Sequence, residues 1–331
     1  MRRSFIALAL ALAAAPVGAQ QDFSKVEVRV EKLAPGVAVL FGAGGNIGLS
    51  YGQDGNVIID DQFAPLTERI NAAIRTIDPD PVRFVINTHW HFDHTGGNEN
   101  FGRAGAVIIA HDNVRQRMST DQVMAAINEK VSASPGVALP VVTFGDGVTL
   151  HLNGDTLHVV HVANAHTDGD SIVHWQNANV LHMGDTFFHR ESFPFIDLDS
   201  GGSIDGVIAA AEKGLQASNE QTRIIPGHGP VATRAELAAY RAMLVDIRGK
   251  VAAGIAAKRT LADPGVEASG ALRDARRLHQ ARPVRRVRLQ QPARGTGEGP
   301  DTHQAAPALS SGGGAPRLRR GCAASGTAPA P

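Results

Sequence analysis

The chain has 331 residues, of which 43% are hydrophobic and 19% are charged, and this composition excludes a fully disordered chain and a collagen-like repeat. Its length allows one large domain or two ordinary ones, and the single cysteine, Cys322, excludes a disulfide framework and a cysteine-based metal site. The net charge is zero, but residues 258–331 hold 13 basic and 5 acidic residues, so the body before them is acidic and offers no bulk attraction to nucleic acid.

The first 19 residues have the three parts of a bacterial secretory signal peptide. Arg2 and Arg3 precede the apolar run Phe5–Val17, and residues 17–19 supply the small residues of a cleavage site. The run is shorter than the ~20 residues that span a bilayer, so we expect cleavage after Ala19 rather than an anchor. The sequence therefore predicts a periplasmic or secreted protein with no membrane span after cleavage.

Residues 20–258 alternate short strands and helices. In the first half, buried or alternating apolar runs predict strands at Val26–Val30, Val37–Phe41, Ile47–Tyr51, Asn56–Asp60, Val82–Ile86 and Ala106–Ala110. Helical spacing predicts helices at Ala64–Ile77 and His111–Met118, and Asp121–Val131 is compatible with a continuation of the second. A flexible, glycine-rich tip, Gly42–Asn46, follows the second strand.

The second half repeats this alternation before the composition changes. It predicts strands at Leu150–Leu152, Leu157–Val162, Ser171–Trp175, Val180–Met183 and Ile224–Ile225, and helices at Ile204–Leu215 and Ala235–Ala256. Two strand-rich halves covered by helices indicate a layered α/β body. Residues 259–331 lack aromatic residues and are rich in Arg, Ala, Pro and Gly, which predicts a disordered tail or a GC-rich gene read out of frame.

Four side chains that can bind a metal fall within the six residues 89–94, shortly after the strand Val82–Ile86. His89 and His91 are two apart on an extended segment and point the same way, so they can share one metal ion. Asp93 and His94 come as the chain turns and can face a second ion. Histidine with carboxylate suits zinc, while iron and manganese accept the same donors.

Three later residues lie at junctions between strands and loops, where layered α/β folds build their sites. His166 is in a polar turn before a strand, Asp185 follows a strand, and His228 is in a loop bounded by Gly and Pro. With the first cluster they provide seven candidate metal ligands.

These residues carry a family resemblance. The order His-x-His-x-Asp-His, then His, Asp and Pro-Gly-His-Gly, resembles the metallo-β-lactamase-fold hydrolases from about residue 26 to residue 256. The resemblance implies an α/β fold of the four-layer αβ/βα sandwich type, with residues 20–258 as the catalytic domain. It also implies two Zn²⁺ ions, one on His89, His91 and His166, and one on Asp93, His94 and His228, bridged by Asp185. Asp60 matches an acid that this family places behind its ligands, where it orients histidines; its other role would be a cap before a helix.

Two metal ions imply hydrolysis of an activated carbonyl. They can hold a hydroxide that attacks the carbonyl and can stabilise the anion that leaves, while Asp93 orients the nucleophile or moves its proton.

Three functional classes remain open. Export and the tip Gly42–Asn46, which resembles a loop that closes over β-lactams, favour β-lactam hydrolysis as the first expectation. Asp185 favours a thioester or lactone hydrolase of the glyoxalase II type, because the lactamases commonly have cysteine or serine there. A metal-dependent, iron-containing oxidoreductase or a zinc-binding accessory protein is the third class.

We expect a small-molecule substrate and no protein partner. His189 and Arg190 are candidates to bind an anionic substrate group, Asn98 could donate to an oxyanion, and Asn46 could contact substrate from the tip. Phe187 and Phe188 are expected in the core.

Overall fold

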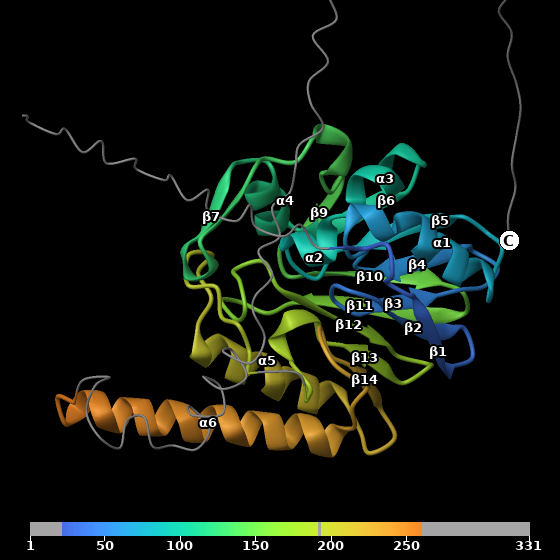
Figure 1. Cartoon of the computed structure of the whole chain (residues 1–331). Coiled ribbons are helices and arrows are strands. Elements are labelled where there is room, and N and C mark those ends of the chain that lie inside the picture. The colour runs from blue at the N-terminus through green and yellow to red at the C-terminus, as the bar shows by residue number, and fades with distance from the viewer. Residues whose placement is uncertain (1–21, 191–192, 260–331) are drawn as a thin grey trace, which may run out of the picture. The chain divides into compact units, whose positions relative to one another are not determined.

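The computed structural model describes residues 22–190 and 193–259, which all belong to one compact unit. Two β-sheets face each other and helices cover their outer faces (Figure 1). The residues of the expected signal peptide and all but the first residue of the expected tail lie outside the described part. Within the described part, no helix is both long and apolar enough to cross a bilayer.

The first sheet has seven strands in the order β1-β2-β3-β4-β5-β6-β9. The strands β1 to β4 form an antiparallel meander, and β4, β5, β6 and β9 are parallel. Parallel strands end at the same edge of a sheet, so the segments after β4 and β5 meet there. The bounds are β1 Arg29–Ala34, β2 Val37–Phe41, β3 Ile47–Ser50, β4 Asn56–Ile59, β5 Val82–Ile86, β6 Val107–His111 and β9 Val142–Phe144.

The second sheet has five strands in the order β10-β11-β12-β13-β14. Its first four strands are antiparallel, and β14 runs parallel to β13. The bounds are β10 Gly147–Leu152, β11 Asp155–His161, β12 Ser171–Trp175, β13 Val180–His182 and β14 Arg223–Ile225. Asn153 and Gly154 have φ of 56° and 73°, which closes the expected hairpin between β10 and β11.

Helices pack on the outer face of each sheet. One apolar cluster joins the first sheet to α1 and α3, a second joins the two sheets, and a third joins the second sheet to α5 and α6. This is the four-layer αβ/βα sandwich that the resemblance implies, so the expected fold class is confirmed. The helices are α1 Thr67–Arg75, α2 Phe92–Thr95, α3 Asn98–Arg103, α4 Asp112–Met118, α5 Ile204–Ala217 and α6 Arg234–Ala256, with short 3₁₀ turns at Ala64–Leu66, Ala125–Ile127, Gly136–Ala138 and Gly184–Thr186.

The segment Asp121–Val131 corrects one sequence expectation. It forms a hairpin of β7, Gln122–Met124, and β8, Glu129–Val131, and does not continue α4. The chain reverses at Asn128, which has a left-handed φ of 51° that helices do not tolerate. The carboxylate of Asp199 accepts from the amide of Ala125 and ties the hairpin to a distant loop.

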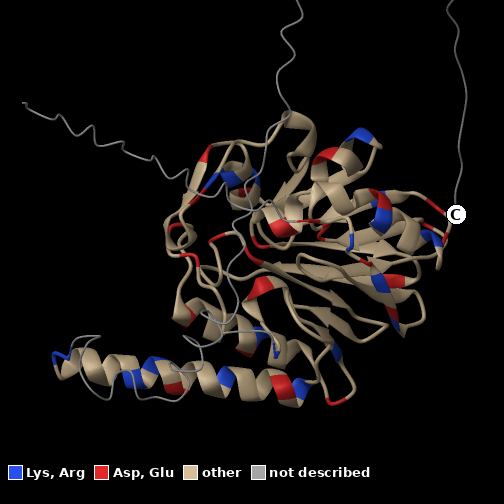
Figure 2. Cartoon of the chain, in the orientation of Figure 1, with Lys and Arg blue, Asp and Glu red and all other residues tan. Residues whose placement is uncertain are grey.

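The first strand begins later than expected, at Arg29 instead of Val26. The guanidinium of Arg69 in α1 binds the carbonyl oxygens of Phe23, Ser24 and Val26, so these residues attach to a helix and not to the sheet. The sequence also missed α2, α3 and β9, whose runs are too short to show a period. Basic and acidic residues are interspersed along α6 (Figure 2).

Candidate metal centre

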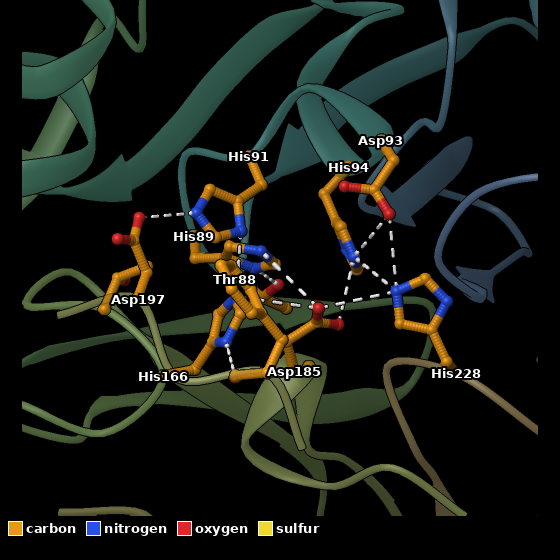
Figure 3. Close-up of polar contacts among 12 residues, drawn as sticks. Thr88, His89, His91, Asp93, His94, His166, Asp185, Asp197 and His228 are labelled. Carbon is orange, nitrogen blue, oxygen red and sulfur yellow. Dashed lines mark hydrogen bonds and ion pairs between the residues drawn. The ribbon is translucent and has the colours of Figure 1, made fainter. Parts of the chain in front are cut away.

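The seven candidate ligands come from loops that meet at one end of the two sheets. His89 and His91 follow β5, and the short helix α2 presents Asp93 and His94. His166 follows β11, Asp185 lies in the 3₁₀ turn after β13, and His228 follows β14. The structure brings all seven together in two groups, with Asp185 between them (Figure 3).

The first group contains His89, His91, His166 and Asp185, all of which are buried. Nδ1 of His91 lies 2.8 Å from Nε2 of His166, and Oδ2 of Asp185 lies 3.6 Å from that same nitrogen. Nε2 of His89 is 3.9 Å from Oδ2 of Asp185 and is a buried nitrogen that makes no hydrogen bond to the described residues. A buried nitrogen without a partner is costly, and a bound cation would satisfy it.

The second group contains Asp93, His94 and His228. Nε2 of His94 lies 3.3 Å from Nε2 of His228, which in turn lies 3.3 Å from Oδ2 of Asp93. Asp185 reaches this group too, because its Oδ1 is 3.0 Å from Nε2 of His94 and its Oδ2 is 3.4 Å from Nε2 of His228. The two oxygens of one carboxylate therefore face both groups.

The donor spacing fits divalent metal ions. Zinc bonds of ~2.0–2.1 Å in tetrahedral geometry place neighbouring donors about 3.3 Å apart, and the donor atoms of each group all lie within 4.8 Å of one another. The donors are imidazole nitrogens and carboxylate oxygens without cysteine, a set that zinc, iron and manganese accept. The described residues thus contain a histidine and aspartate cluster suited to divalent metals.

Burial and nearby charges shift the pKa values of the histidines in opposite directions in the two groups. Burial lowers the pKa of His166 to about 4, and burial together with the neighbouring imidazoles lowers the pKa of His89 well below its usual range. Burial would also lower the pKa of His228, but Asp185 and Asp93 outweigh it and raise the pKa to about 10. His94 is raised for the same reason. Positive charge is therefore favoured at the second group, where a cation must displace these protons to bind.

A carboxylate behind the site holds one histidine of each group. Asp60, which follows β4, is fully buried, and its Oδ2 lies 2.8 Å from Nδ1 of His94 and accepts from the hydroxyl of Thr88 at 2.7 Å. Since that hydroxyl proton is used, Nδ1 of His89, at 3.0 Å, donates to Thr88. Oδ1 of Asp60 accepts from the amide of Thr88. Asp60 orients His94 directly and His89 through Thr88, and it caps no helix.

The sequence analysis missed Asp197, which holds a third histidine. The Oδ2 atom of Asp197 is 3.0 Å from Nε2 of His91, and the side chain is only 2% exposed. Burial would raise the pKa of Asp197, but hydrogen bonds from His91 and Ser200 outweigh it and lower the pKa to about 2. The only sequence signal was weak: a polar, turn-rich run, Asp197-Leu-Asp-Ser-Gly-Gly, after Asp185.

The two asparagines expected to contact substrate are buried and donate to protein groups. Asn98 is fully buried, and its side-chain amide donates to Asn87 and to the carbonyl of Ala138. The amide of Asn46 donates to the carbonyl oxygens of Pro226 and Gly229 on either side of His228. Both side chains hold loops in place in this structure, and their contact with substrate stays a prediction.

His189 and Arg190 also have another partner. Nε2 of His189 is 3.3 Å from the carboxylate of Glu236 in α6, and Arg190 pairs with the same carboxylate. Both side chains therefore contact a carboxylate of the protein, and binding of an anionic substrate group stays a prediction. Phe187 is buried as expected, but Phe188 is only half-buried and stacks on His228, with ring centroids 5.1 Å apart.

A family model described as the metallo-beta-lactamase superfamily matches residues 41–235. The hydroxyacylglutathione hydrolase of Erythrobacter litoralis is 30% identical over 108 residues, which is 32% of this chain and 35% of that protein. The acyl-coenzyme A thioesterase MBLAC2 of Bos taurus is 24% identical over 176 residues, which is 48% of this chain and 58% of that protein. The chain thus spans less than two thirds of the length of these relatives.

Solved structures of low sequence identity share the fold. A metallo-beta-lactamase from Pontibacter korlensis has a TM-score of 0.54 and 21% identity, covering 66% of this chain and 99% of that one. The DIM-1 metallo-beta-lactamase has a TM-score of 0.54 and 20% identity, covering 67% and 99%. At these identities the likeness shows the fold alone.

Proposed function

The chain belongs to the metallo-beta-lactamase superfamily, and we propose that it is a hydrolase with two zinc ions whose substrate is a thioester or a lactone. The observation that carries this proposal is Asp185, whose carboxylate faces the histidines of both groups. Aspartate at this position resembles the glyoxalase II type, and relatives of the chain include a hydroxyacylglutathione hydrolase and an acyl-coenzyme A thioesterase.

The residues divide the work between the two groups. His89, His91 and His166 would hold one ion, Asp93, His94 and His228 would hold the other, and Asp185 would contact both. Two bound divalent ions would supply Lewis acidity, which polarises a substrate carbonyl and makes water acidic enough to provide a nucleophile near neutral pH.

Asp93 would orient the attacking water. Burial would raise the pKa of Asp93, but His94 and His228 outweigh it and lower the pKa to about 2, so its carboxylate is ionised at neutral pH. Its side chain is 23% exposed, at the accessible side of the second group. A carboxylate with so low a pKa is a weak base, so Asp93 would orient the attacking water by accepting a hydrogen bond from it.

The rim of the centre suits an apolar acyl group. The half-buried ring of Phe188 stacks on His228, and the half-buried ring of Phe195 lies 5.9 Å from that of His166. Among residues 22–190 and 193–259, no ion pair joins the seven side chains to a lysine or arginine. A substrate held by its acyl part fits this rim better than one held by a carboxylate.

The tip Gly42–Asn46 no longer argues for a β-lactam. Its backbone is tied to the site, because the amide of Gly45 donates to the carbonyl of Asp93 and the amide of Asn46 donates to the carbonyl of Gly227. The side chain of Gln62 also donates to the carbonyl of Gly45. A segment fastened at these points is a wall of the centre and not a flap that closes over substrate. Export stays part of the proposal, on the sequence of residues 1–19 alone.

The test is a substrate panel with the zinc-loaded full-length chain. Acyl thioesters, followed by release of free thiol, are compared with acyl lactones and a chromogenic cephalosporin. We expect turnover of thioesters or lactones that a chelator abolishes and zinc restores. Asp185→Ala should be inactive, and Gly136→Ala, in an exposed 3₁₀ turn where an added Cβ has no neighbour within 4 Å, should be unchanged. Turnover of the cephalosporin alone would overturn the proposed substrate class. Activity that persists after the chelator is added would overturn the metal dependence.

A further inference from the structure

His182, the last residue of β13, is a buried polar side chain between the two sheets. It pairs with Val173 of β12 and Ile225 of β14, and both of these belong to the apolar cluster that joins the sheets. Its ring reaches the first sheet, since a Cβ added to Gly48 of β3 would lie 3.1 Å from Cδ2 of His182. An imidazole in such a place costs free energy unless both of its nitrogens are hydrogen-bonded.

The two ring nitrogens bind backbone groups of different segments. Nε2 of His182 lies 3.1 Å from the carbonyl oxygen of Asn46, in the tip that precedes β3. Nδ1 accepts from the amide of Gly184 at 3.1 Å, in the 3₁₀ turn that carries Asp185. A carbonyl can only accept and an amide can only donate, so these partners fix His182 as a neutral imidazole with its proton on Nε2. Burial lowers the pKa of His182, which favours the same neutral form.

Asn46 in turn holds the loop that carries His228. The amide of Asn46 donates to the carbonyl of Gly227 at 2.7 Å, and its side chain donates to the carbonyl oxygens of Pro226 and Gly229 at 2.9 and 2.8 Å. Three hydrogen bonds from one residue therefore fix the backbone on both sides of His228. A shift of Asn46 would move this loop with it.

Four of these hydrogen bonds form a closed cycle. His182 donates to Asn46, Asn46 donates to Gly227, the amide of Gly227 donates to the carbonyl of Gly184 at 2.8 Å, and the amide of Gly184 donates back to His182. The cycle is tightly packed, because a Cβ added to Gly227 would lie 2.1 Å from Oδ1 of Asp185. His182 supplies the one side chain in a cycle that otherwise consists of backbone groups.

We propose that His182 is a positioning residue that sets the distance between Asp185 and His228, by joining the turn of the first to the tip that holds the loop of the second. Oδ2 of Asp185 lies 3.4 Å from Nε2 of His228, and both atoms face the second group. His182 acts on them through backbone groups of their segments. The inference rests on the proposed metal centre and concerns its second ion.

Two variants of His182 separate positioning from packing. His182→Leu suits the apolar cluster but removes both hydrogen bonds, whereas His182→Gln keeps one donor for Asn46 and one acceptor for Gly184. A side chain that only filled the core would tolerate leucine better than glutamine, and a positioning side chain requires the opposite order. His174→Leu is the matched control, because His174 pairs with Leu181 and therefore lies on the other face of the same sheet.

The experiment measures the two zinc affinities of the full-length chain by competition with a chromogenic chelator, together with ¹⁵N NMR of the histidines in the metal-free and zinc-loaded wild type. In His182→Leu we expect one zinc affinity to fall about 10- to 100-fold. His182→Gln should restore most of that loss, and His174→Leu should match the wild type. The NMR spectra should show His182 neutral, with a protected proton on Nε2, in both states of the wild type.

Three results would overturn the inference: unchanged zinc affinities in His182→Leu, a glutamine variant that binds zinc no better than the leucine variant, or a wild-type His182 with its proton on Nδ1. The NMR measurement needs no variant and decides even where His182→Leu does not fold. A wild type that binds no zinc at either group would instead overturn the proposed function, so the two failures are distinguishable.

Discussion

Gly45 leaves room for His94, and adding one methyl group there should disable the second group alone. A Cβ atom built on Gly45 would lie 2.0 Å from Cε1 of His94 and 2.5 Å from its Nε2. The backbone cannot retreat easily, because the amide of Gly45 donates to Asp93 and its carbonyl accepts from Gln62. In Gly45→Ala, the ring of His94 must therefore move.

The size of the effect follows from that overlap. Ordinary contact begins at 3.4 Å, so the methyl group and the ring must separate by roughly 1.4 Å. Displacement of a reacting group by about 1 Å can lower the rate about 10²-fold, which corresponds to about 2.7 kcal/mol in the barrier. Overpacking of this kind also costs about 1–3 kcal/mol of stability.

The assay is zinc titration and kcat/KM of Gly45→Ala beside Gly136→Ala, an exposed glycine whose added Cβ would have no neighbour within 4 Å. We expect Gly45→Ala to keep one tight zinc ion, to bind the second weakly and to lose about 10²-fold in kcat/KM, while the control equals the wild type. Two wild-type zinc affinities in Gly45→Ala would refute the reasoning, since the ring could not then have been displaced.

Three further changes test other parts of the centre. Asp60→Asn puts a donor against the hydroxyl of Thr88 and Nδ1 of His94, so both zinc affinities should fall about 10- to 100-fold; an effect on one ion only would contradict the connection through Thr88. Burial and the neighbouring His161 lower the pKa of His111, and Nδ1 of His111 accepts a hydrogen bond from the amide of Asn113. The unfolded chain, in which the pKa is near 6.5, therefore takes up this proton more readily than the folded protein does. The stability of the fold should decrease as the pH falls through this range. His111→Asn keeps an acceptor at this helix start, and its urea midpoint should fall less than that of the wild type between about pH 7.5 and about pH 5.5; an equal fall would exclude His111 as the source. Removing zinc with a chelator should lower the thermal midpoint of the wild type by roughly 10 °C if free zinc is about a thousandfold above its Kd; the same decrease in Asp185→Ala would show that the loss arises elsewhere.

The sequence predicted the candidate ligands because their signal is local. Four of them fall within the six residues 89–94, shortly after a buried strand, and the ends of parallel strands meet at one edge of a sheet. The resemblance then supplied the order of His166, Asp185 and His228, which the structure places beside them. The layered fold was predictable for the same reason, since its strands are continuous apolar runs.

The sequence could not predict which polar side chains are buried or which residues they contact across long stretches of chain. Asn46 and Asn98 were assigned to substrate because polar side chains near a motif suggest a role, but each is enclosed and satisfied by backbone or side-chain groups. Asp197 meets His91 across 106 residues of sequence, and no local period marks such a contact. The hairpin of β7 and β8 was missed because three-residue strands carry too few side chains to show alternation.

The residues around the centre are of two kinds: some contact both ligand groups, and others contact only one. Asp185 and Asp60 each act on both groups, the first through its two oxygens and the second through His94 and Thr88. By contrast, Asp197 acts only on the first group and Gly45 only on the second. The same zinc titration applied to all four positions should then give two kinds of result: loss of both ions for the shared carboxylates, and loss of one ion for the others. That pattern would show that the two metal groups share supporting carboxylates, because two independent sites would not both lose their ions when one carboxylate is changed.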